Sequence, residues 1–383
     1  MKFEAIAAHV CALTALYYAR RVAAFAPDWV TVAPLECSPG PQPALSIVVP
    51  ARDEERSIEA CVRSLLAQTF LDFEVIVVDD RSTDATAEIL QHLAAEDSAL
   101  RVVTGEDLPD GWVGKPWSLH QGAAVARGSW LLFTDADSVH APSGAATALW
   151  LARGLGVDAL TIATGQEMQT FWERALLPSI LAMILFAAGT PGELNAPKRT
   201  DRALANGQYL LVSRAAYDAL GGHSALRGEV VEDVEFARHL KADGRFRLAF
   251  VIATRLARVR MYRSFTEIWQ GFTKNFYLGA RGDVAALVLA ATFFVALSAA
   301  PPLLALHALR TRRYSLAAEA LATSAAIVAT ASWSFARVAI PRRLALFQPL
   351  GTLVLAGIAL NSTWRGMSGR GVEWRGRTYP PTR

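Results

Sequence analysis

Trp130 to Ser138 reads Trp-Leu-Leu-Phe-Thr-Asp-Ala-Asp-Ser, a short apolar run that ends at Asp135 and Asp137. The run is typical of a buried strand, and because side chains alternate along an extended chain, both carboxylates leave its end on the same side. Mg²⁺ and Mn²⁺ bind through one or two carboxylates together with the phosphates of a substrate. The stretch therefore predicts a site for a nucleoside diphosphate, although an Asp-x-Asp alone also suits a turn or a helix cap.

The segments around this run alternate between buried strands and amphipathic helices. We expect strands at 44–50, 73–78, 100–103 and 130–134, and helices from about 57, from about 84 and at 116–126. Such alternation predicts an α/β fold with a mostly parallel sheet, in which ligands bind at the carboxyl ends of the strands. Asp53, Asp80, Asp135 and Asp137 all follow strand ends, which a capping role alone does not explain.

Hydrophobic content, net charge and cysteine spacing limit the classes of protein that fit this sequence. The 383 residues are 52% hydrophobic with a mean hydropathy of +0.25, and the apolar excess lies towards the two ends of the chain. A net charge of +3 does not favour a nucleic-acid partner. Cys11, Cys37 and Cys61 have neither metal-site spacing nor a disulfide pattern, which indicates a reducing compartment. Nothing in the sequence indicates an oligomeric state.

The N-terminal segment, 1–25, predicts a membrane anchor. Phe3 to Ala19 is mostly apolar, and Arg20 and Arg21 follow it, whereas a cleaved signal peptide carries its positive charges first. A retained anchor with its N-terminus outside fits this order, and an interfacial helix is the alternative. Residues 26–43 contain five prolines and are expected to be a linker.

Residues 284–362 predict C-terminal transmembrane helices, with candidate spans at 284–309, 316–340 and 344–360, and a basic tail follows at 363–383. If the catalytic domain is cytoplasmic, three membrane crossings after it would place this tail outside the cell, whereas the arginines of the tail favour the cytoplasm. A re-entrant segment kinked at Pro301 and Pro302 would reconcile the two. Residues 175–188 are also apolar but look too short for a span, so we expect an interfacial or buried core helix there.

Several motifs occur in a fixed order along residues 44–280, and with them the chain resembles the family 2 glycosyltransferases of the GT-A fold. The resemblance is strongest to the membrane-bound branch that includes diaponeurosporenoate (carotenoid) and hopanoid-associated glycosyltransferases, and ceramide glucosyltransferases are more distant. The motifs that carry it are Val48 to Glu55, Val78 to Asp84, Gly114 to Trp117, Phe133 to Asp137, Ala205 to Gln208 and Glu232-Asp233, and the tail Trp374 to Tyr379 is similar to the carotenoid branch.

The resemblance implies a UDP-sugar donor and a role for each matching residue. Asp80 would contact the uridine part of the donor, with Pro50, Arg52 and Glu54 lining the same pocket, while Asp79 is expected to be a turn residue. Lys115 would meet the diphosphate. Asp135 and Asp137 would bind Mn²⁺ or Mg²⁺.

Asp233 matches the general base of the family, and Glu232 would support it, although carboxylates in a first helical turn are also ordinary partners of the helix dipole. The implied reaction is a single in-line displacement that inverts the anomeric configuration. The Gln-x-x-Arg-Trp motif of many relatives is missing, which counts against a processive synthase. By resemblance to the carotenoid branch, Gln270 and Lys274 would lie beside the diphosphate instead.

A catalytic domain held between apolar ends predicts a membrane lipid as the acceptor, with Trp172, Trp269, Phe272 and Tyr277 at its entrance. The expected location is the inner membrane, multi-pass, with the catalytic domain in the cytoplasm. Two alternatives remain at this point. A polyprenyl-phosphate acceptor would need extra cations, for which Arg255, Arg258 and Arg260 are candidates. A non-catalytic membrane scaffold is the other, against which the four strand-end and helix-start carboxylates argue.

Overall fold

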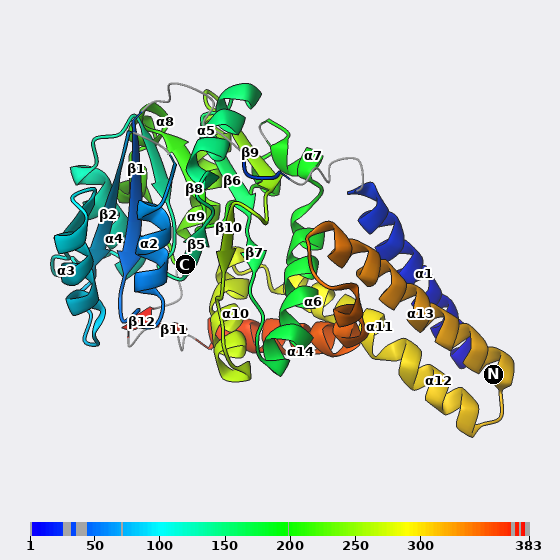
Figure 1. Ribbon diagram of the computed structural model, residues 1–383. Helices are drawn as coiled ribbons and strands as arrows, with labels where there is room; N and C mark the ends of the chain where they lie inside the picture. Colours follow the sequence, from blue (N-terminus) through cyan, green and yellow to red (C-terminus); the bar gives the residue numbers. More distant parts are fainter. Residues whose placement is uncertain are drawn as a thin grey trace.

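The structure is a computed structural model that describes residues 2–25, 32–35, 44–69, 72–197, 199–368, 372–374 and 377–379. A layered α/β domain lies beside a group of long helices drawn from both ends of the chain (Figure 1). Most of the predicted linker 26–43 falls outside the described residues, as do 369–371, 375–376 and 380–383 of the predicted basic tail.

The α/β domain is built on one mixed sheet with the strand order β3-β2-β1-β4-β8-β6-β9. Its pairings are parallel except those of β8, which runs antiparallel to β4 and β6. The mostly parallel sheet predicted from the sequence is confirmed. The strands are β1 (Leu45–Ala51), β2 (Phe73–Asp79), β3 (Leu100–Thr104), β4 (Trp130–Phe133), β6 (Ala159–Ala163), β8 (Leu210–Ser213) and β9 (Leu248–Ile252).

Alternating side chains of the strands build an apolar core on each face of this sheet. Ile47 and Val49 of β1 join one core with α2 (Ile58–Leu66), α3 (Thr86–Glu96) and α5 (Gly144–Leu155). Val48 points to the other core, which includes α4 (Gly114–Val125), α8 (Arg214–Ala219), η3 (Gly222–Leu226) and α9 (Glu232–Asp243). Up to β4, the predicted bounds of the strands and of the helix at 116–126, and the predicted starts of the two earlier helices, agree with the observed ones to within one or two residues.

A second, three-stranded sheet was not predicted. It consists of β5 (Ser138–His140), β10 (Ala257–Val259) and β7 (Gly165–Gln166), in that order, and two- and three-residue strands leave no readable alternation in the sequence. β5 begins directly after Asp137, so this sheet fixes the backbone that leaves the Asp-x-Asp motif. The connection from the long helices back to β8 contains α7 (Pro191–Asn195) and η2 (Thr200–Arg202).

The long helices form two groups (Figure 1). An arm of α1 (Lys2–Ala24), α12 (Ala300–Arg310) and α13 (Tyr314–Arg337) points away from the sheet, while α11 (Val284–Ser298) and α14 (Gln348–Met367) pack together nearer to it. α6 (Phe171–Ala188) and α10 (Phe265–Gly279) lie between these helices and the α/β domain, and η4 (Arg342–Phe347) precedes α14.

Three helical segments among the described residues are long and apolar enough to cross a membrane: α6, α13 and the run Arg342–Met367. α11 and α12 make a fourth if they count as one span, bent by 43° beside Pro301 and Pro302, where a kink was expected. The expectation that residues 175–188 are too short is wrong, because Thr170 caps the helix in a capping box with Glu173 and starts it at Phe171. α1, expected to be an anchor, is not among these segments.

The C-terminal boundary also differs from the prediction. α14 continues to Met367, so the first residues of the predicted tail are helical. Further along, β11 (Val372–Trp374) and β12 (Arg377–Tyr379) pair as an antiparallel hairpin within the motif that resembles the carotenoid branch.

Candidate active site

A cavity of about 460 Å³ opens at the carboxyl ends of β1, β2 and β4, and residues of α1, α6 and α13 also line it. Almost all of the predicted site residues line it: Pro50, Arg52, Glu54, Asp80, Lys115, Asp135, Asp137, Glu232, Asp233 and Lys274. Gln270 does not, because it is exposed on α10 outside the cavity. The structure thus separates Gln270 from the residues with which it was expected to act.

The loops after β1 and β2 are tied to each other by backbone groups. Asp53 and Arg81 have positive φ values of 53° and 58°, a conformation uncommon outside glycine. The Asp53 N–H donates to Ser82 Oγ (3.0 Å), and Thr83 N–H donates to Asp53 Oδ1 (2.7 Å). Asp79 accepts from Ser82 N–H (3.2 Å), which is the turn role expected for it.

This bracing positions Arg52 and Asp80 at the mouth of the cavity. Arg52 Nη1 donates to the backbone oxygen of Asp80 at 2.6 Å and lies 3.9 Å from its carboxylate. Asp80 is almost fully buried, and its own N–H donates to Ala51 O at 2.7 Å. The pair therefore presents a rigid carboxylate and a guanidinium beside it, suited to the polar edge of a base and ribose.

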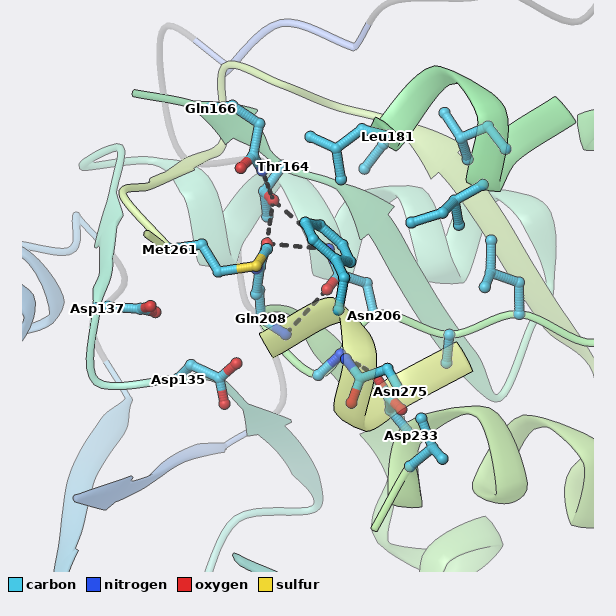
Figure 2. A pocket seen from close by; sticks show the side chains of 18 of the residues that line it. Asp135, Asp137, Thr164, Gln166, Leu181, Asn206, Gln208, Asp233, Met261 and Asn275 are labelled. Atoms are coloured by element: carbon cyan, nitrogen blue, oxygen red, sulfur yellow. Dashed lines mark hydrogen bonds between the residues drawn. The ribbon is translucent and has the colours of Figure 1, made fainter. Parts of the chain in front are cut away.

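Asp135 and Asp137 follow β4 and face the same cavity (Figure 2). Burial and the neighbouring carboxylates of Asp135 and Glu54 raise the pKa of Asp137 to about 7. Its Oδ1 is buried, and no hydrogen-bond partner for it is found in the described part of the chain. A divalent cation suits this site, because it would give the buried oxygen a partner and would reduce the repulsion between the neighbouring carboxylates.

No group of three or more His, Cys, Asp or Glu side chains among the described residues forms a ready-made metal cage. An ion held by Asp135 and Asp137 would therefore complete its coordination with oxygens of a bound diphosphate or water, as Mg²⁺ commonly does.

Lys115, near the start of α4, connects the strand-end carboxylates to α9. Its Nζ lies 2.7 Å from Asp135 Oδ1 and 2.8 Å from Glu232 Oε1. Burial opposes its charge, but Asp135, Glu232 and Asp233 outweigh that effect and raise the pKa of Lys115 well above its ordinary value. Burial and the nearby Lys115 charge lower the pKa of Lys274 to about 8, so both lysines carry a charge at neutral pH.

Asp233 is held by two backbone donors at the start of α9. Gly207 N–H donates to its Oδ2 (2.7 Å) and Val234 N–H to its Oδ1 (2.8 Å). A Cβ at position 207 would lie 2.8 Å from Lys115 Nζ and 3.3 Å from Asp233 Oδ2, so a side chain there would displace Lys115. Burial and the Glu232 charge raise the pKa of Asp233 to about 6, which suits a group that accepts a proton near neutral pH.

A polar network in the same cavity was not predicted as part of the site (Figure 2). Thr164 Oγ1 donates to Gln208 Oε1 (2.6 Å), Gln166 Nε2 donates to Thr164 Oγ1 (3.2 Å), and Asn206 Nδ2 donates to the backbone oxygen of Ile162 (3.0 Å). Asn206 and Gln208 lie in a motif that the sequence marks without a role. Thr164 and Gln166 lie outside every motif, so only the fold brings them here.

The aromatic residues expected at an acceptor entrance do not all line the cavity. Phe272 lines the cavity. Trp172 and Trp269 instead contact Phe265, and Tyr277 packs against Gly366 of α14. The apolar wall of the cavity comes from other helices, chiefly from α1, α6 and α13, which no motif identifies.

Comparisons with known proteins agree with this arrangement. Residues 46–197 match the family described as glycosyl transferase family 2. A 4,4'-diaponeurosporenoate glycosyltransferase of Staphylococcus aureus (strain MRSA252) is 26% identical over 353 residues, 88% of each chain. The relative of that name in Staphylococcus haemolyticus is 24% identical, and the match spans 62% of this chain and 62% of that protein.

Among solved structures, a mannosyltransferase from Pyrobaculum calidifontis in complex with GDP-Man and Mn²⁺ matches 95% of this chain and 98% of its own, with a TM-score of 0.54 and 19% identity. This similarity concerns the fold. It supports the expectation of the nucleotide-diphospho-sugar transferase architecture.

Proposed function

Because the chain belongs to glycosyl transferase family 2 and is a glycosyltransferase, we propose that it moves a sugar from a UDP-sugar to a lipid acceptor in the membrane, with inversion at the anomeric carbon. One observation carries the proposal: a single cavity contains the strand-end carboxylates, Asp233 and an apolar wall from the long helices. This arrangement supports a site in which the donor sugar and the lipid acceptor meet.

Asp233 accepts the proton of the acceptor hydroxyl in this proposal. Its two backbone donors hold the carboxylate in one orientation, and Glu232 beside it keeps its pKa near 6. As the acceptor O–H bond breaks towards Asp233, the acceptor oxygen forms a bond to the anomeric carbon. The bond from that carbon to the donor phosphate breaks, and its electron pair leaves with the nucleoside diphosphate.

Lys115 and Lys274 lie where the negative charge of this leaving group develops, and both line the cavity. A Mn²⁺ or Mg²⁺ ion bound by Asp135 and Asp137 would supply further neutralisation of the diphosphate. Arg52 and Asp80, with Pro50 and Glu54, would hold the uridine end of the donor. The lipid acceptor and the apolar helices together favour a multi-pass protein of the inner membrane with its catalytic domain in the cytoplasm.

The alternative of a polyprenyl-phosphate acceptor has less support. A phosphate acceptor would need free cations beside Asp233, but Arg260 pairs with the buried Glu173 at 2.8 Å. Arg255 and Arg258 are exposed, and Arg258 lies 3.7 Å from Glu167. None of these arginines lines the cavity.

The direct test is transfer of label from a panel of radioactive UDP-sugars, with GDP-mannose for comparison, into total membrane lipid by the purified full-length protein. Each donor is assayed with Mn²⁺, Mg²⁺ or EDTA. We expect label from a UDP-sugar in a phosphate-free lipid, and only with metal. Label in an acid-labile phospholipid would favour the polyprenyl-phosphate alternative, and transfer in EDTA would contradict the metal requirement.

A further inference from the structure

The cavity has an apolar wall that donor chemistry does not use. Val22 of α1, Leu181 and Leu185 of α6, and Phe335 and Val338 at the end of α13 all line it. Figure 2 shows Leu181 on the side of the pocket away from Asp137. Three helices that are distant in sequence thus share one surface with the proposed catalytic base.

The α6 side chains on this wall are only partly buried, although the helix lies inside the bundle. Leu181, Leu185 and Phe186 are each partly exposed, whereas Tyr18 and Phe335, which also line the cavity, have 1% of their surface exposed. Apolar side chains that face an internal space are typical of a site that an apolar ligand fills.

The charges of the cavity lie elsewhere. Among the described residues, α1, α6 and α13 contribute no Asp, Glu, Lys, Arg or His to the lining of the cavity. The charged lining residues come from the α/β domain and α10: Arg52, Glu54, Asp80, Lys115, Asp135, Asp137, Glu232, Asp233 and Lys274. The part of an occupant that contacts this wall is therefore uncharged, since an ionised group there would be buried without a partner.

The outer faces of the same helices show where such an occupant comes from. Leu13 and Leu16 of α1 and Leu321 of α13 are more than half exposed, at 65%, 54% and 52%. Exposed leucines on helices next to segments long enough to span a membrane indicate contact with lipid. The helices that line the cavity are therefore also the helices that would contact the hydrocarbon of the bilayer.

We propose that the apolar wall of α1, α6 and α13 binds the hydrocarbon chain of the acceptor, a lipid with one long apolar chain and a hydroxyl-bearing head that reaches Asp233. This inference rests on the proposed function and names the acceptor's site. A cavity of about 460 Å³ lies within the range of sites that hold one small molecule, so we assign the wall to a single chain of the acceptor. α1 then belongs to the substrate site.

Photolabelling tests this without relying on turnover. The full-length protein in phospholipid vesicles is irradiated with a sixteen-carbon alcohol that carries a diazirine at the far end of its chain, and the labelled peptides are identified by mass spectrometry. We expect label in 18–25, 181–186 and 334–340, and its loss when unlabelled hexadecanol is added. Label confined to outward residues such as Leu13 and Leu289, unaffected by competitor, would overturn the proposal.

A matched pair of variants sharpens the test. Leu185→Trp fills the wall, and we expect at least fivefold less labelling at these three segments with UDP affinity within twofold of wild type. Leu13→Trp places the same bulk on the outer face of α1 and should change neither. If Leu185→Trp loses UDP binding as well, Ala182→Val, which adds only two methyl groups to the same wall, replaces it. Undiminished labelling in a variant that binds UDP contradicts the site.

The two proposals fail in different ways. If the protein transfers sugar into membrane lipid but its apolar wall is not labelled, the proposed function is retained and the proposed binding site for the hydrocarbon chain is overturned. Competed labelling of the wall in a protein that transfers no sugar from any donor would overturn the proposed function, and with it the identification of the bound chain as an acceptor.

Discussion

Asp233 is the residue whose surroundings matter most for the proposed chemistry. Burial and Glu232 raise its pKa to about 6, so below that pH the carboxylate binds a proton and no longer accepts one from the acceptor. We expect kcat/KM to fall about tenfold per pH unit below pH 6 and to level off above it. The measurement is a pH profile of transfer at saturating metal.

Glu232→Gln offers a check on that assignment. Removing the neighbouring negative charge removes one of the two main causes of the raised pKa, so the acid limb should move to lower pH. An acid limb that stays in place, or moves upward, would mean that another group controls it.

Lys115 occupies the position between the proposed metal ligands and the base, 2.7 Å from Asp135 and 2.8 Å from Glu232. Lys115→Met removes a cation that competes for Asp135, so we expect tighter Mn²⁺ binding without nucleotide but at least tenfold weaker UDP binding. Calorimetric titration of each ligand measures both. Lys115→Arg, which keeps the charge, should retain most UDP affinity, and weaker Mn²⁺ binding by Lys115→Met would contradict this account.

The elements that position these residues depend on close packing of α4 against the sheet. A Cβ at Gly122 would lie 2.4 Å from Val48 Cγ1 and 3.1 Å from Val78 Cγ2. We expect Gly122→Ala to destabilise the fold by about 1–3 kcal/mol through overpacking. Thermal unfolding in detergent measures the effect as a lower midpoint.

Gly154→Ala is the matched control in α5, because nothing lies within 4 Å of the added Cβ. It should stabilise the helix by about 0.5–1 kcal/mol, since alanine loses less conformational freedom on folding. Equal effects of the two substitutions would show that α4 does not pack as described.

Elements and site were predictable from the sequence to different degrees. β1, β2 and β4 have apolar runs that end at chemically distinctive residues, so their ends and Asp80, Asp135 and Asp137 could be anticipated. Thr164 and Gln166 could not, because β6 and β7 bring them in from a segment without a motif. The apolar wall depends on α1, α6 and α13 meeting in space, which periodicity within any one helix does not report.

At the scale of the whole molecule, contacts between α10 and α14 bear on the membrane topology. Tyr277 N–H donates to Ser362 Oγ (2.9 Å), which donates to Thr273 O (2.6 Å), and Asn361 Nδ2 donates to Thr273 Oγ1 (3.2 Å). α10 continues directly from the α/β domain, so these bonds hold the end of α14 next to that domain. An odd number of crossings after the catalytic domain does not fit this arrangement.

We therefore expect a C-terminal tag to be digested together with the catalytic domain when protease is added to sealed inverted vesicles, where the cytoplasmic face is outside. A tag that stays protected while the domain is cleaved would require a third crossing and would contradict the α10–α14 contact. A tag on the N-terminus, digested or protected in the same vesicles, reports separately whether α1 crosses.

The central claim is that the chain transfers sugar to a membrane lipid with Asp233 as base, and Asp233→Asn tests it most directly. The measurement compares label transferred from the preferred UDP-sugar into lipid by wild type and variant, with UDP affinity determined on the same preparations. We predict a loss of about 10²- to 10⁴-fold in transfer with UDP affinity nearly unchanged. Near-wild-type transfer by Asp233→Asn would contradict the claim.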